Sequence, residues 1–238
     1  MHVFLLLYNI QGGMDMKTVI IACKTMKKEL LAAMSRIPCS CEVRWLEAGM
    51  HNRPKQLNEQ LQALLDACSG FDTVLLCMSL CGNAVAGLRT HDFQLIIPRC
   101  DDCISLMLGD SARRKAIPAT YFFTEGWLKS DQSLWSEYQN CLQKYGKSRT
   151  DRIFSEMLSH YRHLALLNTG CFDIPQIEQE VREIAKTFSL EYVQIEGTLD
   201  YIRRLLTGDW DTTDFIIVPK HSTLALAMCS LKGAEIHA

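Results

Sequence analysis

Three cysteines stand where expected strands end, and they are the strongest candidates for chemistry in this chain. Cys23 closes an apolar run, Cys81 follows a second run, and Cys103 opens a helix-like stretch just after a third. In an open α/β sheet, ligands gather in the crevice outside the carboxyl ends of the strands. Thiolates delivered there from separate strands can converge on one metal ion or one reactive centre.

Zinc is the metal that these residue types favour. Cys23, Cys81 and Cys103 would be its ligands, with His51 as a fourth ligand or water in that place, because thiolate and imidazole prefer zinc or another transition metal over magnesium. No pair of these residues has zinc-ribbon spacing. A second interpretation therefore stays open, in which the cysteines are buried at strand ends and His51 caps a loop.

The segment from Cys100 to Cys103 has the C-x-x-C form of a dithiol redox motif. Its two aspartates oppose thiolate formation, whereas the start of a helix favours it. We expect instead that Asp101 or Asp102 caps the helix and that Cys103 alone faces inward.

Three further positions are candidates for binding a ligand. Gly82 and Asn83 begin a loop of small residues that would allow close backbone approach, and we group them with Asp102 as cofactor-binding residues. Arg99 follows a strand, and its guanidinium could bind a carboxylate or phosphate through two parallel hydrogen bonds. We therefore treat it, together with His51, as a catalytic candidate. Its rival role is an ion pair with Asp102. No standard phosphate-binding fingerprint and no G-x-S-x-G elbow occurs.

Composition narrows the function classes. The chain has 238 residues, a net charge of −2 and scattered lysines and arginines, so we expect no nucleic-acid partner. No apolar stretch is long enough to span a bilayer, and the first ten residues make a poor signal peptide. Eleven cysteines without an export signal indicate a reducing cytoplasm, that of an anaerobe in particular, and their odd number argues against a disulfide framework.

The pattern along the chain predicts alternating strands and helices. Expected strands are 18–22, 41–46, 72–78, 93–98, 119–124, 163–168, 191–195 and 214–219. Expected helices are 24–35, 52–65, 101–108, 131–145, 151–161, 175–188 and 198–206. Such alternation predicts an α/β fold, a three-layer Rossmann-like unit with a mainly parallel sheet.

Two points of domain organisation are open. Residues 1–15 are either an N-terminal extension or an overlong start, because Met16 lies two residues before the first expected strand. Residues 16–238 are expected to form a single domain. The alternative has two lobes with a boundary near 125–162 and a helical insertion near 131–161.

Six motifs resemble the landmarks of the domain-of-unknown-function 1638 family. They are IPRCDDCISLMLG (97–109), SLCG (79–82), AGMHNRP (48–54), TEGW (124–127), NTG (168–170) and LLTGDW (205–210). The resemblance runs from Met16 to about Pro219, and its most specific part is P-R-x-x-D-C-I-x-L-x-L-G. The family's usual Y-G-x-C-G is here MSLCG (78–82), so a tyrosine role at that place is in doubt.

The resemblance implies a biological setting. The family is best known from anaerobic bacteria and methanogenic archaea, and its members often accompany corrinoid-dependent methyltransferases for methylamines and related methyl donors. Its biochemical activity is unassigned. By this resemblance Cys23, His51, Cys81, Arg99, Asp102 and Cys103 occupy family motif positions.

Two functions follow as hypotheses. One is a metal-binding accessory protein or metalloenzyme of anaerobic methyl transfer, with zinc on the three thiolates, a small-molecule substrate, and corrinoid methyltransferase proteins as partners. The other is a non-catalytic protein that binds a small ligand or handles a corrinoid in the same crevice. The D-x-H-x-x-G corrinoid motif is absent from the sequence.

Overall fold

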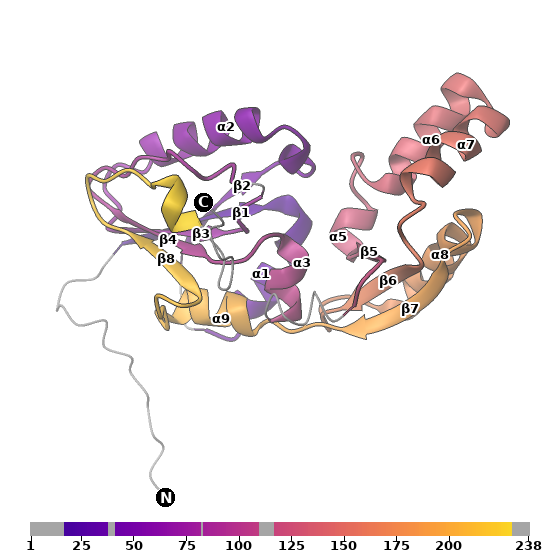
Figure 1. Ribbon diagram of the computed structural model, residues 1–238. Helices are drawn as coiled ribbons and strands as arrows, with labels where there is room; N and C mark the ends of the chain where they lie inside the picture. The colour runs from indigo at the N-terminus through magenta and orange to yellow at the C-terminus, as the bar shows by residue number, and fades with distance from the viewer. Residues whose placement is uncertain (1–16, 38–40, 82, 110–116, 230–238) are drawn as a thin grey trace, which may run out of the picture.

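The computed structural model describes residues 17–37, 41–81, 83–109 and 117–229 (Figure 1). Its strands form two sheets that stand side by side, one built mainly from the first part of the chain and one from the middle part. The C-terminal segment, here residues 215–229, returns to the first sheet.

The first sheet has the order β2-β1-β3-β4-β8. Its strands are β1 (Thr18–Cys23), β2 (Glu42–Leu46), β3 (Thr73–Cys77), β4 (Gln94–Pro98) and β8 (Phe215–Val218). The first four run parallel, and β8 pairs with β4 antiparallel. Residues Val19 to Ala22 of β1 are fully buried, as expected for a short apolar strand that is covered on both faces.

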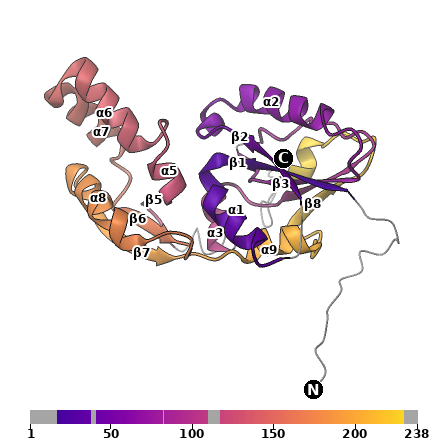
Figure 2. The ribbon, with the colours of Figure 1, turned by 180° about the vertical axis from the view of Figure 1, so that it is seen from behind.

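Helices cover the two faces of this sheet. They are α1 (Lys27–Met34), α2 (Pro54–Asp66), α3 (Cys103–Leu108) and α9 (Asp200–Thr207). Val19 and Ile21 pack with α2, whereas Ile20 and Ala22 pack with α1, α3 and α9. This alternation along one strand places α2 on one face and the other three helices opposite, as Figures 1 and 2 show.

The second sheet has the order β5-β6-β7, all parallel. Its elements are β5 (Thr120–Phe123), β6 (His163–Asn168), β7 (Glu191–Glu196), α5 (Glu125–Leu128), α6 (Leu134–Tyr145), α7 (Lys147–Met157) and α8 (Ile174–Thr187). One face packs beneath α6, α7 and α8. On the other face, Phe122, Ala165 and Leu167 join the same buried cluster as Ile20 and Leu30 of the first sheet's layer. The two sheets therefore share a hydrophobic core.

The α/β prediction is confirmed, and each of the eight expected strands is present. The strands are divided between two sheets, which the prediction of one mainly parallel sheet did not include. The chain passes to the second sheet between Pro98 and Thr120 and returns between Glu196 and Phe215. The expected helical segment near 131–161 is the pair α6 and α7, joined at Gly146 and lying over the second sheet.

Three short 3₁₀ helices complete the description: η1 (Lys24–Met26), η2 (Met50–Asn52) and η3 (Leu226–Cys229). Within the described ranges, nine cysteines carry free thiols and Cys41 is disulfide-bonded. None of the helices in this part of the chain has the length and apolar character needed to cross a membrane. Residues 1–15, expected to be an extension, lie outside the described residues.

Candidate functional site

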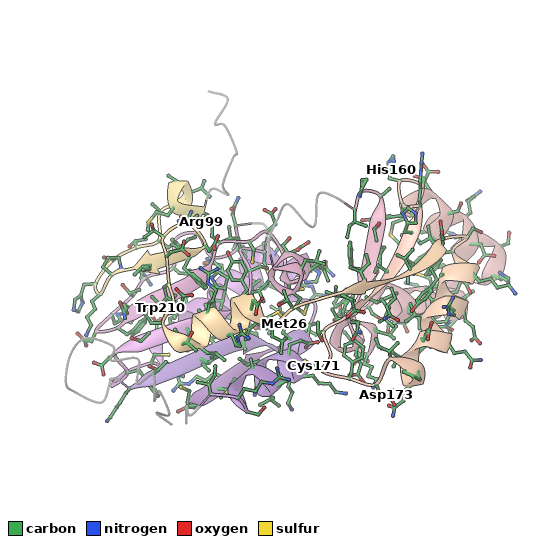
Figure 3. The ribbon with its side chains drawn as sticks, turned by 90° about the horizontal axis from the view of Figure 1, so that it is seen from below. Met26, Arg99, His160, Cys171, Asp173 and Trp210 are labelled. Carbon is green, nitrogen blue, oxygen red and sulfur yellow. The ribbon has the colours of Figure 1, made fainter. Side chains whose placement is uncertain are left out.

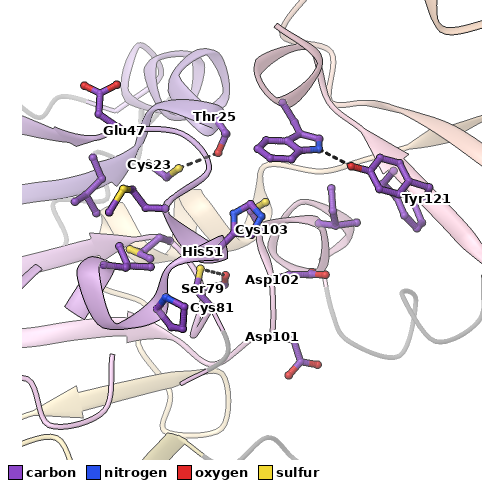
Figure 4. Close-up of a pocket in the computed structure, with 18 residues that line it drawn as sticks. Cys23, Thr25, Glu47, His51, Ser79, Cys81, Asp101, Asp102, Cys103 and Tyr121 are labelled. Atoms are coloured by element: carbon purple, nitrogen blue, oxygen red, sulfur yellow. Dashed lines mark hydrogen bonds between the residues drawn. The ribbon is translucent and has the colours of Figure 1, made fainter. Parts of the chain in front are cut away.

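A crevice of about 380 Å³ lies where the carboxyl ends of the first sheet's strands meet the second sheet (Figure 4). One wall comes from the loops after β1, β2 and β3 together with the start of α3. The facing wall comes from β5 and α5. The lining residues are Cys23, Thr25, Leu46, Glu47, Met50, His51, Pro54, Leu57, Met78, Ser79, Cys81, Asp101, Asp102, Cys103, Ile104, Tyr121, Phe122 and Trp127.

All three candidate cysteines line this crevice. Cys23 is the last residue of β1, Cys81 follows β3 by a short loop, and Cys103 is the first residue of α3. Two backbone hydrogen bonds join the loop after β3 to the segment that leads into α3. The Leu80 amide donates to the Cys100 carbonyl, and the Cys81 amide donates to the Asp101 carbonyl. Parallel strands ending at one edge thus bring residues 23, 81 and 103 to one place.

Hydroxyl groups accompany two of the sulfurs. The Thr25 hydroxyl donates to Sγ of Cys23 at 3.0 Å, and Ser79 Oγ lies 3.2 Å from Sγ of Cys81. A hydroxyl donor stabilises a thiolate more than a neutral thiol, because the anionic sulfur is the stronger acceptor. The local structure is therefore suited to sulfur that carries negative charge.

Burial acts against ionisation of the Cys81 and Cys103 thiols. It raises the pKa of Cys81 to about 11, with the nearby Cys23 and Asp102 adding to the shift and the Ser79 hydrogen bond opposing it. Burial also raises the pKa of Cys103, and the charges of Asp102, Cys23 and Cys81 raise it further. Without a cation in the crevice these thiols are neutral at pH 7.

The side chains do not form a ready-made metal site. Within the part of the chain that the structure describes, no three His, Cys, Asp or Glu side chains are grouped so that they could hold a metal ion. Figure 4 shows Cys23, Cys81, Cys103 and His51 around the same space. Binding of one ion by the three sulfurs would therefore require changes of side-chain rotamer.

His51 lies on η2 and faces the opposite wall. Its ring centroid is 5.1 Å from that of Trp127 on α5, with the ring planes tilted by 53°. Burial lowers the pKa of His51, while the charge of Asp102 raises it. The imidazole is thus neutral at pH 7, the form that can bind a metal or accept a proton.

Asp102 caps α3, as expected for one of the two aspartates. Its Oδ1 accepts a hydrogen bond from the Ser105 amide at 2.7 Å. Cys100 is buried and Cys103 half-buried, and both are free thiols. Only Cys103 of this pair lines the crevice, which agrees with the inward orientation expected for it.

Arg99 is placed away from the crevice lining. Its backbone amide donates to the Asp214 carbonyl at 2.7 Å, and its Nη1 donates to the Met228 carbonyl at 2.6 Å. Figure 3 shows Arg99 beside the C-terminal segment. The end of β4 is covered by this segment because β8 pairs with β4 there, so we assign Arg99 to holding the segment rather than to orienting a ligand.

The small-residue loop also contributes less than expected. Asn83 is exposed, has a left-handed backbone with φ of 66° and is not among the lining residues. Its carbonyl accepts from the Ala86 amide, which closes a turn. Gly82 lies outside the described residues.

Sequence reasoning missed the facing wall. Trp127, the last residue of the TEGW motif, lines the crevice, and its Nε1 donates to the Tyr121 hydroxyl at 3.0 Å. Burial raises the pKa of Tyr121 to about 12, so the phenol is neutral. The signal was present, since Tyr121 lies on the fifth expected strand and Trp127 comes shortly after its carboxyl end.

Comparison with known proteins gives one match. The family described as "Protein of unknown function (DUF1638)" matches residues 45–206, which is more than half of the chain. No curated protein and no solved structure matches the chain. The matched range contains His51, Cys81, Cys103 and Trp127, while Cys23 lies before it. The chain belongs to the DUF1638 family, as its motifs indicated.

Proposed function

We propose that this protein binds a transition metal ion, zinc first, through Cys23, Cys81 and Cys103, in a crevice that also admits a small molecule. The observation that carries the proposal is the arrival of three thiols from three separate elements in one crevice. Thiolates are the preferred protein ligands of zinc and of other borderline-soft ions.

Rearrangement of the thiols on binding is part of this proposal. Zinc holds thiolates at about 2.3 Å, which places tetrahedral sulfur ligands roughly 3.5–4 Å apart. Rotation about one side-chain bond moves the sulfur of a cysteine, and metal binding often orders its own ligands. The hydroxyls of Thr25 and Ser79 support ionised sulfur at two of the three positions.

The chemistry that a bound ion would supply is activation of a water or a substrate thiol by lowering its pKa. His51 would serve as the fourth ligand or as a proton acceptor, because its imidazole is neutral and lines the crevice. A role in anaerobic methyl transfer, with corrinoid methyltransferase proteins as partners, is the part of this proposal that comes from the family resemblance alone. The cytoplasmic setting is proposed from the eleven cysteines of the sequence.

Metal titration tests the proposal. Protein purified anaerobically and freed of metal by a chelator is titrated with zinc against a chromophoric competitor. We expect one zinc per chain, with release of protons as the thiols ionise. A protein that takes up no zinc, cobalt or iron under reducing conditions contradicts the metal site.

A second candidate function is metal-free binding of a small ligand, including the handling of a corrinoid. It is favoured by the absence of a three-ligand group among the described side chains and by the neutral state of the buried thiols. This candidate predicts that the chelator-treated protein binds its ligand as tightly as the zinc-treated protein.

A further inference from the structure

Exposed apolar side chains gather on the hairpin of α6 and α7. Of the five large hydrophobic side chains that are exposed in the described part of the chain, three lie here: Tyr145 at the end of α6, and Ile153 and Met157 on α7. Ile153 is 40% exposed and Met157 47% exposed, and together with Arg152 and Glu156 they line a shallow hollow. An apolar patch rimmed by polar groups is typical of a protein–protein contact.

The folding of the hairpin does not account for this patch. Thr150, Phe154 and Leu158 are the buried residues of the α7 region, and the last two join the core that α6, α8 and the second sheet share. Residues three or four apart lie on one face of a helix. The four residues of the hollow therefore occupy the opposite face of α7, which the fold leaves to solvent.

The two charges of the hollow have no partner within the described residues. Neither Arg152 nor Glu156 makes an ion pair or a side-chain hydrogen bond there, whereas Lys147 and Asp151 on the same helix pair at 2.6 Å. Arginine four residues before glutamate is the less favourable order for a pair within one helix. Both charges are thus available to a second molecule.

The pattern on α7 is complementary to itself. The charged row Arg152–Glu156 lies beside the apolar row Ile153–Met157, and each row spans four positions. In an antiparallel pair of α7 helices, with a two-fold axis near the middle of these rows, Arg152 of one copy would face Glu156 of the other. Ile153 would likewise face Met157. A two-fold interface requires one patch that matches its own copy in this way.

We propose that this face of α7 docks a second copy of the chain, in a two-fold symmetric dimer joined through residues 152–157. The proposal is independent of the metal. Figures 1 and 2 show the hairpin at the outer end of the second sheet, away from the first sheet, so the crevice stays open in such a dimer. One pair of helices buries less than the roughly 1,200–2,000 Å² of a standard interface, so we expect dissociation in the micromolar range.

Charge reversal tests the pairing. Sedimentation velocity is measured over a series of concentrations, in reducing buffer so that disulfides between copies do not form. Arg152→Glu alone and Glu156→Arg alone each place like charges together at both symmetry-related contacts. Each should weaken the dimer about tenfold or more. An equimolar mixture of the two variants should restore it, because the new carboxylate of one chain faces the new guanidinium of the other.

Three further variants serve as controls. The double variant Arg152→Glu/Glu156→Arg has the net charge of the parent and should dimerise like the parent. Ile153→Ser should weaken the dimer without a change of charge. Glu180→Arg alters an exposed carboxylate on α8 and changes the net charge as much as Glu156→Arg does, yet it should leave the dimer unchanged. Circular dichroism checks that each variant is folded.

Three results would overturn the proposal. A parent chain that stays monomeric well above the micromolar range would leave this face to a partner of another kind. A dimer that survives Ile153→Ser and both single charge reversals would be formed elsewhere on the molecule. Dissociation by the single reversals without rescue in the mixture or in the double variant would refute the two-fold pairing. Zinc uptake is measured separately, so the dimer and the metal site fail independently.

Discussion

The Thr169 hydroxyl donates a hydrogen bond of 2.9 Å to Oε1 of Glu29, across 140 positions of sequence. Glu29 lies on α1 against the first sheet, and Thr169 follows β6 of the second sheet. Both side chains are buried. This bond, together with the shared core around Phe122 and Leu167, connects the two walls of the crevice from behind.

Glu29 makes stability depend on pH. Burial raises its pKa, with hydrogen bonds from its own backbone and from Thr169 opposing the shift. A carboxyl with a raised folded-state pKa stabilises the fold fully below its unfolded pKa and loses that contribution as pH rises through the folded value. The ionised form of Glu29 is thus a cost at neutral pH.

Glu29→Gln removes this titration. We expect the stability of the variant relative to the parent to increase steadily from about pH 4.5 towards neutrality, as linkage requires. Urea unfolding at a series of pH values measures the difference. Because any fixed loss of hydrogen bonding is the same at all pH values, only the slope is diagnostic. Parallel curves for the two proteins would refute the assignment, and Thr169→Val is the control that keeps the carboxyl.

At Gly126 the α5 backbone lies in close contact with the backbone of the opposite wall. A Cβ at this position would lie 2.1 Å from the Thr25 carbonyl oxygen, and a backbone atom cannot move away as a flexible side chain can. Gly126→Ala should therefore destabilise the protein by about 3 kcal/mol and displace α5, which carries Trp127. Gly70→Ala is the control, since a Cβ there meets nothing within 4 Å and only its φ of 84° is unfavourable. Equal losses in thermal unfolding would contradict the close contact.

The strands were predictable from the sequence because each is a short apolar run between turns. Their partners were not. β4 and β5 are both short apolar strands, and whether the two pair is decided by contacts distant in sequence, such as that of Phe122 with the α1 layer. The antiparallel direction of β8 follows from the path of α9 and the return of the chain, which a four-residue apolar run does not encode.

The part of the candidate site that lies at the carboxyl ends of strands was predictable, because parallel strands end at one edge of a sheet. That rule placed Cys23, Cys81 and Cys103 in one crevice. It misplaced Arg99, because the end of β4 is covered by the C-terminal segment. It also gave no indication of the aromatic wall, which depends on how the second sheet stands against the first.

Arg99 should behave as a structural residue. Removing its hydrogen bond to the Met228 carbonyl in Arg99→Gln should cost about 1–3 kcal/mol, since the donor is charged and partly buried. Faster amide exchange at residues 226–229, measured by mass spectrometry, is the expected local effect. The affinity for zinc should stay unchanged. Loss of zinc binding without faster amide exchange at residues 226–229 would show that Arg99 acts at the crevice and not in holding the C-terminal segment.

His51 should report on the crevice through Trp127. Because burial depresses the His51 pKa, the imidazole should become charged only below its ordinary range near 6.5. Protonation then quenches the nearby indole, so fluorescence that is lost in Trp127→Phe should fall with a midpoint below pH 6.5. The depressed pKa also means that the neutral imidazole of His51 is the form that the fold favours. Its contribution to stability is therefore present at neutral pH and is lost as pH falls through the folded-state pKa. His51→Gln should abolish the transition, and a transition that persists in this variant would exclude His51 as its source.

The metal site makes the last prediction. Cys81→Ser and Cys103→Ser should each lower zinc content at least tenfold while the fold is kept, since serine has nearly the same volume but is a poor ligand for a borderline-soft ion. Cys68→Ser is the matched control, because Cys68 is buried in the cluster beneath α2 and does not line the crevice. Elemental analysis after anaerobic purification, with circular dichroism as the check on folding, compares the three variants with the parent. Equal zinc in all four proteins would place the metal elsewhere. No metal in the parent would leave the thiols as part of a metal-free ligand site.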